Sequence, residues 1–372
     1  MVKLKTVLNG VAISAISAGF LIGCGGGSSD DNNSDSSTVS ADQTYTGPGS
    51  KWDVTLNDDS TFVITRRESA SAPVTMTVNG NYVRHDTGFV SLTVSSSSGD
   101  GGPDAGDTAW ALEVPGYAFL LKPTGDHSSQ MIAMVSAGSC PTTDISANWV
   151  VVKNSDESDA DSSERDFFGT FNFDVDSGTA SLPSRYALAD DFASQGANEQ
   201  LPAGTCSDGL MAFEDAVMYL TSNGGALVHT GADDDDHSSI IFALSQSSIS
   251  SMSTIDGHYA GMLFDDNMED SGDKIHPVSM DCSNGTCTGT MVMNIETGAT
   301  SNDSVTINLD ASSIDSLGTG FVTGTIVSEE ESGSLACMVD DNAAGSGSTI
   351  VSCVGQSPGD NSKIFNVMFV SH

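Results

Sequence analysis

The chain has 372 residues, and its 12 Lys and Arg against 50 Asp and Glu give a formal net charge of -38. Neutralising phosphates requires clustered Lys and Arg, so this charge excludes a nucleic-acid-binding protein. The acids comprise 39 Asp and 11 Glu. Because Asp is a poor helix former and a good turn residue, the composition predicts many turns and few long helices.

Residues 1–23 have the layout of an export signal. Lys3 and Lys5 precede an apolar stretch, and the segment contains no acid. The stretch is too short and too rich in small residues to be a membrane span. It ends in Leu21-Ile22-Gly23-Cys24, which resembles the lipobox of bacterial lipoproteins.

That resemblance implies that the signal is cut before Cys24 and that Cys24 carries the acyl chains. Gly25 follows where the class can have Asp, which in Gram-negative members is compatible with transfer to the outer membrane. The implied partner is therefore the membrane, with the protein facing the periplasm or the outside. Loss of residues 1–23 removes two lysines and no acid, so the mature charge would be -40. The alternative is an ordinary cleaved signal with a chance cysteine.

Composition divides the rest of the chain into five segments. A Gly-, Ser- and Asp-rich tract cannot bury surface and is expected to be a flexible acidic tether. Apolar residues then alternate with polar ones, as in Trp52-Asp-Val-Thr-Leu56, which predicts half-buried strands separated by turn clusters. The expected segments are the tether 24–44, a β unit 45–153, an acidic linker 154–165, a middle β-rich segment 166–255 and a C-terminal β unit 256–372.

The predicted fold class is all-β, with antiparallel meander units that are barrel-like or sandwich-like, because either arrangement shields strand edges. Few short helices are expected, and the candidates are 185–194 and 211–217 in the middle segment. This segment either folds alone or completes a neighbouring unit. Weak echoes suggest duplication, with recurrent hairpin chemistry as the alternative. Tyr45-Thr-Gly47 resembles Phe167-Phe-Gly169 and Tyr259-Ala-Gly261, and Asp86-Thr-Gly-Phe-Val90 resembles Gly318-Thr-Gly-Phe-Val322.

Six cysteines remain after Cys24, and an even number in an exported chain predicts three disulfides. Six cysteines allow 15 pairings, of which pairing between sequence neighbours is the simplest. Asn284-Gly285 is a strong hairpin signal between two of the cysteines, and another pair flanks a loop between apolar runs. A zinc site made from the last four cysteines is the rival, although their spacing lacks the paired short gaps of zinc modules. The favoured pairs are Cys140 with Cys206, Cys282 with Cys287, and Cys337 with Cys353.

Acidic clusters are the main chemically suggestive feature. Asp265, Asn267, Glu269 and Asp273 occupy positions 1, 3, 5 and 9 of a calcium loop, whereas positions 6 and 12 depart from that motif. These four residues are candidate calcium ligands, with solvated acidic loops as the alternative. Gly355-Gln-Ser-Pro-Gly359 matches a hydrolase nucleophile motif, but Pro358 lacks the backbone N–H that the oxyanion hole needs, so a hairpin turn is expected instead.

These features favour an outer-membrane-anchored lipoprotein that acts as a non-enzymatic binding, adhesion or envelope-structural module. No catalytic motif nominates an active site, and no cofactor other than calcium is suggested. Two alternatives stay open. A lipocalin-like barrel could carry a small apolar ligand, and a glycan hydrolase could use paired carboxylates.

Overall fold

The computed structural model describes most of the chain from residue 42 onward. No helix in this described part is long and apolar enough to cross a membrane. The described residues are 42–47, 51–69, 71–99, 101–124, 131–136, 139–153, 167–188, 192–196, 199–200, 206–212, 216–221, 225–230, 239–266, 274–328, 331–343 and 347–372.

The first strands form an antiparallel meander that closes into a barrel where β1 pairs with β8. Alternate residues point inward, so that Val54 and Leu56 of β2 meet Phe62 and Ile64 of β3 in one apolar cluster. The strands are β1 (Gln43–Gly47), β2 (Trp52–Leu56), β3 (Thr61–Arg67), β4 (Val74–Arg84), β5 (Phe89–Ser98), β6 (Thr108–Val114), β7 (Ala118–Pro123) and β8 (Ile132–Val135).

The middle of the chain forms an open antiparallel sheet. Its central strand β9 (Ile145–Lys153) pairs with β10 on one side and β18 on the other. From the sequence we expected residues 145–153 to belong to the β unit 45–153, but β9 pairs with β10 and β18 of the middle sheet. The other strands are β10 (Phe168–Asp174), β11 (Thr179–Tyr186), β12 (Ser194–Gly196), β13 (Glu199–Gln200), β14 (Cys206–Ser207), β15 (Leu210–Ala212), β16 (Ala216–Leu220), β17 (Ala226–Thr230) and β18 (Ser239–Ser245).

The last strands form a second closed barrel, in which β19 pairs with β26. The prediction of an all-β protein built from antiparallel meanders is therefore confirmed, and both closed units are eight-stranded barrels rather than sandwiches. The strands are β19 (Gly257–Asp265), β20 (Ile275–Ser283), β21 (Thr286–Asn294), β22 (Ala299–Leu309), β23 (Phe321–Ser328), β24 (Glu331–Asp340), β25 (Ile350–Ser357) and β26 (Asp360–Ser371). The turn at Pro358-Gly359 joins β25 to β26, as expected.

The helix prediction at 211–217 is wrong, because Met211 and Ala212 lie in β15 while Ala216 and Val217 lie in β16. The prediction at 185–194 also fails at both ends, which lie in β11 and β12. Within the described part of the chain, η3 (Met252–Ile255) and η4 (Ala311–Ser313) are short 3-10 turns.

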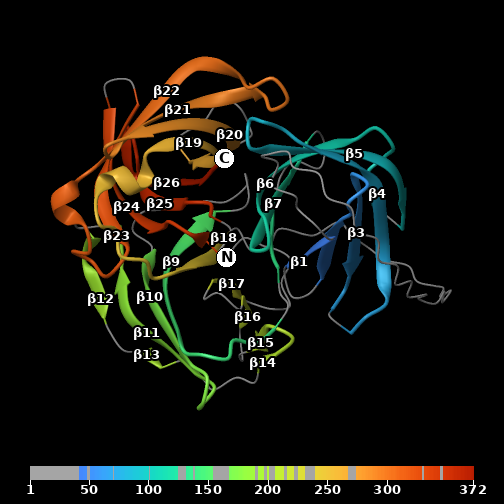
Figure 1. The fold of residues 1–372 in the computed structure, drawn as a ribbon, viewed down its shortest axis with the longest axis horizontal. Helices are drawn as coiled ribbons and strands as arrows, with labels where there is room; N and C mark the ends of the chain where they lie inside the picture. Colours follow the sequence, from blue (N-terminus) through green and yellow to red (C-terminus); the bar gives the residue numbers. More distant parts are fainter. Residues whose placement is uncertain are drawn as a thin grey trace, which may run out of the picture.

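The two barrels and the middle sheet lie against one another (Figure 1), and one cluster of buried residues, the shared core, includes side chains from all three. It contains outward-facing residues of both barrels, such as Trp110 and Met338, together with Val150 and Phe242 of the middle sheet. The outer walls of the barrels are therefore buried where they meet the sheet. Polar groups bridge these contacts as well: Tyr219 Oη donates to Gly47 O at 3.1 Å, Asn366 Nδ2 to Val151 O at 3.0 Å, and Thr87 Oγ1 to Ile295 O at 2.6 Å.

The two barrels share sequence echoes at equivalent strands. Tyr45 and Tyr259 lie in the first strand of each barrel, and both are buried. The Asp86–Val90 and Gly318–Val322 echoes both lead into the fifth strand, and the glycines at the shared position, Gly88 and Gly320, have φ of 81° and 84°. This left-handed conformation favours glycine at both turns. The matching positions support an origin of the two barrels by duplication.

Candidate functional site

Both barrels are filled by their own side chains. Aromatic and aliphatic residues from all eight strands occupy the first barrel, including Tyr45, Phe62 and Phe119. Eight-stranded barrels have interiors just wide enough for side chains to fill. Any ligand of the barrels would therefore have to bind at their ends or outer faces.

A hollow of about 370 Å³ lies at one end of the first barrel. The start of β1, the end of β2, the β2–β3 turn and the end of β4 meet there. Its walls carry amide, carboxylate, hydroxyl and guanidinium groups beside two aliphatic side chains. The lining residues are Gln43, Leu56, Asp58, Ser60, Tyr82, Val83 and Arg84.

Arg84, which lines this hollow, forms an ion pair with a buried carboxylate of the barrel interior. Glu113 of β6 points into the barrel, and its side chain is 3 % exposed. Arg84 Nε lies 2.6 Å from Glu113 Oε2, and Arg84 Nη2 lies 2.9 Å from Oε1, so the pair is bidentate. Tyr45 Oη donates to the same Oε1 at 2.8 Å. Both carboxylate oxygens of Glu113 are therefore engaged.

The ion pair continues as a chain of hydrogen bonds to the β2–β3 turn. Arg84 Nη1 donates to Tyr82 Oη at 2.9 Å, and Tyr82 Oη donates to Asn57 O at 2.9 Å. The Arg84 guanidinium also lies 4.9 Å from the Tyr82 ring centre. These contacts hold the rim of the hollow in one arrangement.

The protonation states of Tyr45 and Arg84 do not change over the usual pH range. Burial, followed by the charge of Glu113, raises the pKa of Tyr45 above its ordinary value. Burial alone would lower the pKa of Arg84, but its hydrogen bonds to Glu113 and the Glu113 charge raise it. The phenol stays neutral and the guanidinium stays charged. Because Glu113 compensates Arg84, the hollow is suited to a polar ligand that does not bring a full negative charge.

The sequence alone did not indicate this site. Trp110, Leu112 and Val114 of β6 are buried in the shared core outside the barrel. The inward positions are Ala111 and Glu113. The sequence feature that could have indicated the site is Glu113 itself, a single acid on the opposite face of the apolar strand β6.

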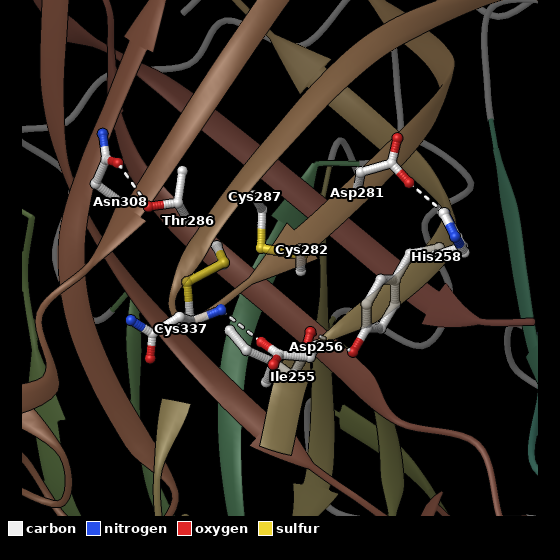
Figure 2. The surroundings of a disulfide bond; sticks show 12 residues. Ile255, Asp256, His258, Asp281, Cys282, Thr286, Cys287, Asn308 and Cys337 are labelled. Carbon is white, nitrogen blue, oxygen red and sulfur yellow. Dashed lines mark hydrogen bonds and ion pairs between the residues drawn. A yellow bond between two sulfur atoms is a disulfide. The ribbon is translucent and has the colours of Figure 1, made fainter. Parts of the chain in front are cut away.

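The interior of the second barrel contains two disulfides (Figure 2). Cys282 and Cys287 are directly opposite on β20 and β21, and Cys337 and Cys353 are directly opposite on β24 and β25. The Asn284-Gly285 turn between the first pair has φ of 49° and 84°, which fits the hairpin turn expected from the sequence.

The third disulfide joins Cys140 to Cys206, with Cα atoms 5.9 Å apart. It ties the segment before β9 to the edge strand β14 of the middle sheet. The three pairs are those that sequence proximity favoured. All six sulfurs are used in these bonds, so these cysteines are not arranged as a zinc site.

The proposed calcium loop is only partly described. Asp265 accepts a hydrogen bond from Ser357 Oγ, and the neighbouring Asp266 pairs with Lys274 and with Lys363, whose Nζ lies 3.1 Å from Asp266 Oδ2. Among described residues, no group of three His, Cys, Asp or Glu is placed to hold a metal ion. The predicted ligands Asn267, Glu269 and Asp273 lie outside the described residues, as does Cys24.

Comparisons with known proteins found little likeness. No family model and no curated protein sequence matches the chain. A solved structure of a mutant of the vaccine antigen transferrin-binding protein B (TbpB) from Haemophilus parasuis is 12 % identical, with a TM-score of 0.25 over 86 % of this chain and 66 % of that one. The isotype 1 TbpB from serogroup B Neisseria meningitidis is 10 % identical, with a TM-score of 0.16 over 86 % and 64 %.

The matched region thus spans less than two thirds of either TbpB chain. At these TM-scores the likeness identifies neither a family nor a ligand. The function of the chain has to be argued from its own residues.

Proposed function

We propose that the chain is a non-enzymatic binding module held at the bacterial outer membrane by a lipid on Cys24. The anchor rests on Leu21-Ile22-Gly23-Cys24 and on the acidic tether that follows it. The binding role rests on the hollow at the end of the first barrel, whose polar lining includes Arg84, and on the hydrogen bonds that hold Arg84 to the buried Glu113.

The geometry favours binding over catalysis at this hollow. A general base must reach a substrate proton, but both oxygens of Glu113 already accept hydrogen bonds. A preorganised polar surface with little freedom to move instead lowers the entropic cost of binding.

The same observations disfavour the carrier alternative. A carrier of an apolar molecule needs an empty barrel interior, whereas apolar side chains occupy both interiors. Adhesion or envelope support would use the same rigid scaffold, and these roles fall within the proposed binding function.

The anchor is tested by changing Cys24→Ser. The variant is expected in the soluble fraction, whereas the unchanged protein should sediment with outer membranes. Continued sedimentation of the variant would contradict the lipid anchor and would leave the binding role to be judged separately.

The binding role is tested with a photocrosslinking amino acid at Val83, which lines the hollow and is 53 % exposed. Val74 is the matched control, because it is 45 % exposed at the other end of the same strand, about 30 Å away. Light on intact cells should give a discrete adduct from position 83 but not from position 74. No adduct at 83, or equal adducts at both positions, would contradict binding at this hollow.

A further inference from the structure

A second hollow lies on the open face of the middle sheet. It has a volume of about 330 Å³ and is formed by β9, β10, β11 and β13. Its lining residues are Asp144, Ile145, Ser146, Asn172, Phe173, Asp174, Thr179, Ser181 and Gln200.

The centre of this hollow is a polar row that crosses four neighbouring strands. Ser146 is directly opposite Asn172, Asn172 is opposite Ser181, and Ser181 is opposite Gln200. Adjacent strands lie about 4.8 Å apart, so the row is about 14 Å long. We call Ser146, Asn172, Ser181 and Gln200 the polar row.

A rigid apolar layer backs the polar row. Ile145, Phe173 and Ala180 alternate with it and point to the opposite face, where all three are buried in one cluster. The side chains of Ile145 and Phe173, the aliphatic and aromatic residues of the hollow, therefore pack in the core. The open face offers hydroxyl and amide groups.

Two carboxylates lie beside the row in fixed positions, each two residues along the chain from a member of the row. Asp144 Oδ1 accepts the Val175 N–H at 3.0 Å, and Asp174 Oδ1 accepts both the N–H and the hydroxyl of Ser177 at 2.7 Å. The lining includes no Lys, Arg or His. An anionic ligand would meet repulsion here, and an apolar ligand would cover polar groups without satisfying them.

Hydroxyl groups match this surface, because each can donate and accept hydrogen bonds, as can the amides and hydroxyls of the polar row. A ligand that spans the row must present such groups repeatedly along its length. We propose that the polar row binds an oligosaccharide that carries no acidic groups. This inference is independent of the hollow on the first barrel and of the lipid anchor.

The geometry indicates binding and not hydrolysis. A glycosidase needs a carboxylic acid that holds its proton near neutral pH. Hydrogen bonds from Ser177 lower the pKa of Asp174, so this carboxyl is unsuited to act as the general acid. The saccharide should be recovered unchanged after incubation with the protein.

The test uses the mature full-length protein in a detergent without a sugar head group. Calorimetric titration is carried out with three probes: maltohexaose, the hexamer of N-acetylglucosamine, and hexagalacturonate. At least one neutral hexamer should bind saturably, and hexagalacturonate should bind at least tenfold more weakly.

The decisive variant combines Asn172→Ala with Gln200→Ala. Both side chains are exposed, so folding should be little affected, and loss of their hydrogen bonds should weaken binding about tenfold or more. Asn81→Ala is the control, because Asn81 is an exposed strand asparagine on the first barrel. No binding of either neutral hexamer, equal loss in the control, or unchanged affinity in the double variant would overturn the proposal.

Discussion

The ion pair inside the first barrel predicts an asymmetry between its two partners. In Glu113→Gln the charge left behind belongs to Arg84, whose side chain is 32 % exposed and can be hydrated. In Arg84→Met the charge left behind belongs to Glu113, which is 3 % exposed. Because an unpaired charge costs more where water cannot reach it, Arg84→Met should be the more damaging change.

The magnitudes follow from this difference in burial. Breaking a buried pair typically costs about 3 to 5 kcal/mol, and we expect this range for Arg84→Met. Partial exposure of Arg84 screens the charge left by Glu113→Gln, so its cost should be about 1 to 2 kcal/mol. The double variant leaves no charge in the barrel and should be more stable than Arg84→Met alone.

The assay is urea unfolding of the mature protein with its disulfides intact, followed by tryptophan fluorescence. Trp110 lies on β6, close in sequence to Glu113, and reports on the first barrel. Equal destabilisation by the two single variants would refute the reasoning from burial. If the double variant is less stable than Arg84→Met, the unpaired carboxylate of Glu113 is not the cause of the lost unfolding free energy.

Three further predictions concern other parts of the molecule. Paired Cys→Ala changes should cost about 4 kcal/mol at Cys140–Cys206 and about 2 kcal/mol at Cys282–Cys287, because the loops span 66 and 5 residues; equal losses in unfolding free energy would contradict this. If the segment 265–273 binds calcium, millimolar calcium should raise Tm more than magnesium at equal ionic strength, and equal shifts would leave only charge screening. Burial and the nearby His258 charge lower the pKa of His372 below its ordinary 6.5, so its contribution to stability is fully present above pH 6.5 and is lost as the pH falls through the lowered value. An NMR titration midpoint for His372 at or above 6.5 would contradict this environment.

Strand patterning predicted the fold best where one face of a strand is buried. Val54 and Leu56 alternate with polar neighbours and point into the first barrel as expected. Strands that pack on both faces lose this alternation. In β26, Phe365 and Phe369 fill the second barrel while Ile364 and Met368 lie in the shared core, so apolar residues occupy both faces and only Asn366 interrupts them.

Local propensity failed in the middle sheet. The segment 211–217 contains Met, Ala and Glu, which favour helices. Tertiary contacts override this preference, because Met211 and Met218 are directly opposite each other across β15 and β16 and are both buried in one cluster. Nothing within the segment reveals those partners.

The candidate sites were harder to predict because they depend on register. Glu113 lies beside Arg84, 29 residues away, because of the register of β4, β5 and β6. The polar row depends on the alignment of four strands whose residues, from Ser146 to Gln200, are spread widely along the chain. A sequence shows which side chains are polar but not which of them lie side by side.

The central claim is that both barrels are filled scaffolds and that recognition takes place on their surfaces. Fluorescence titration of the mature protein with the apolar fatty acid cis-parinaric acid tests it most directly, because a hollow barrel would enclose such a molecule. The filled interiors predict no saturable binding. Saturable one-to-one binding that an inward substitution such as Val54→Trp abolishes, without unfolding the protein, would contradict the account.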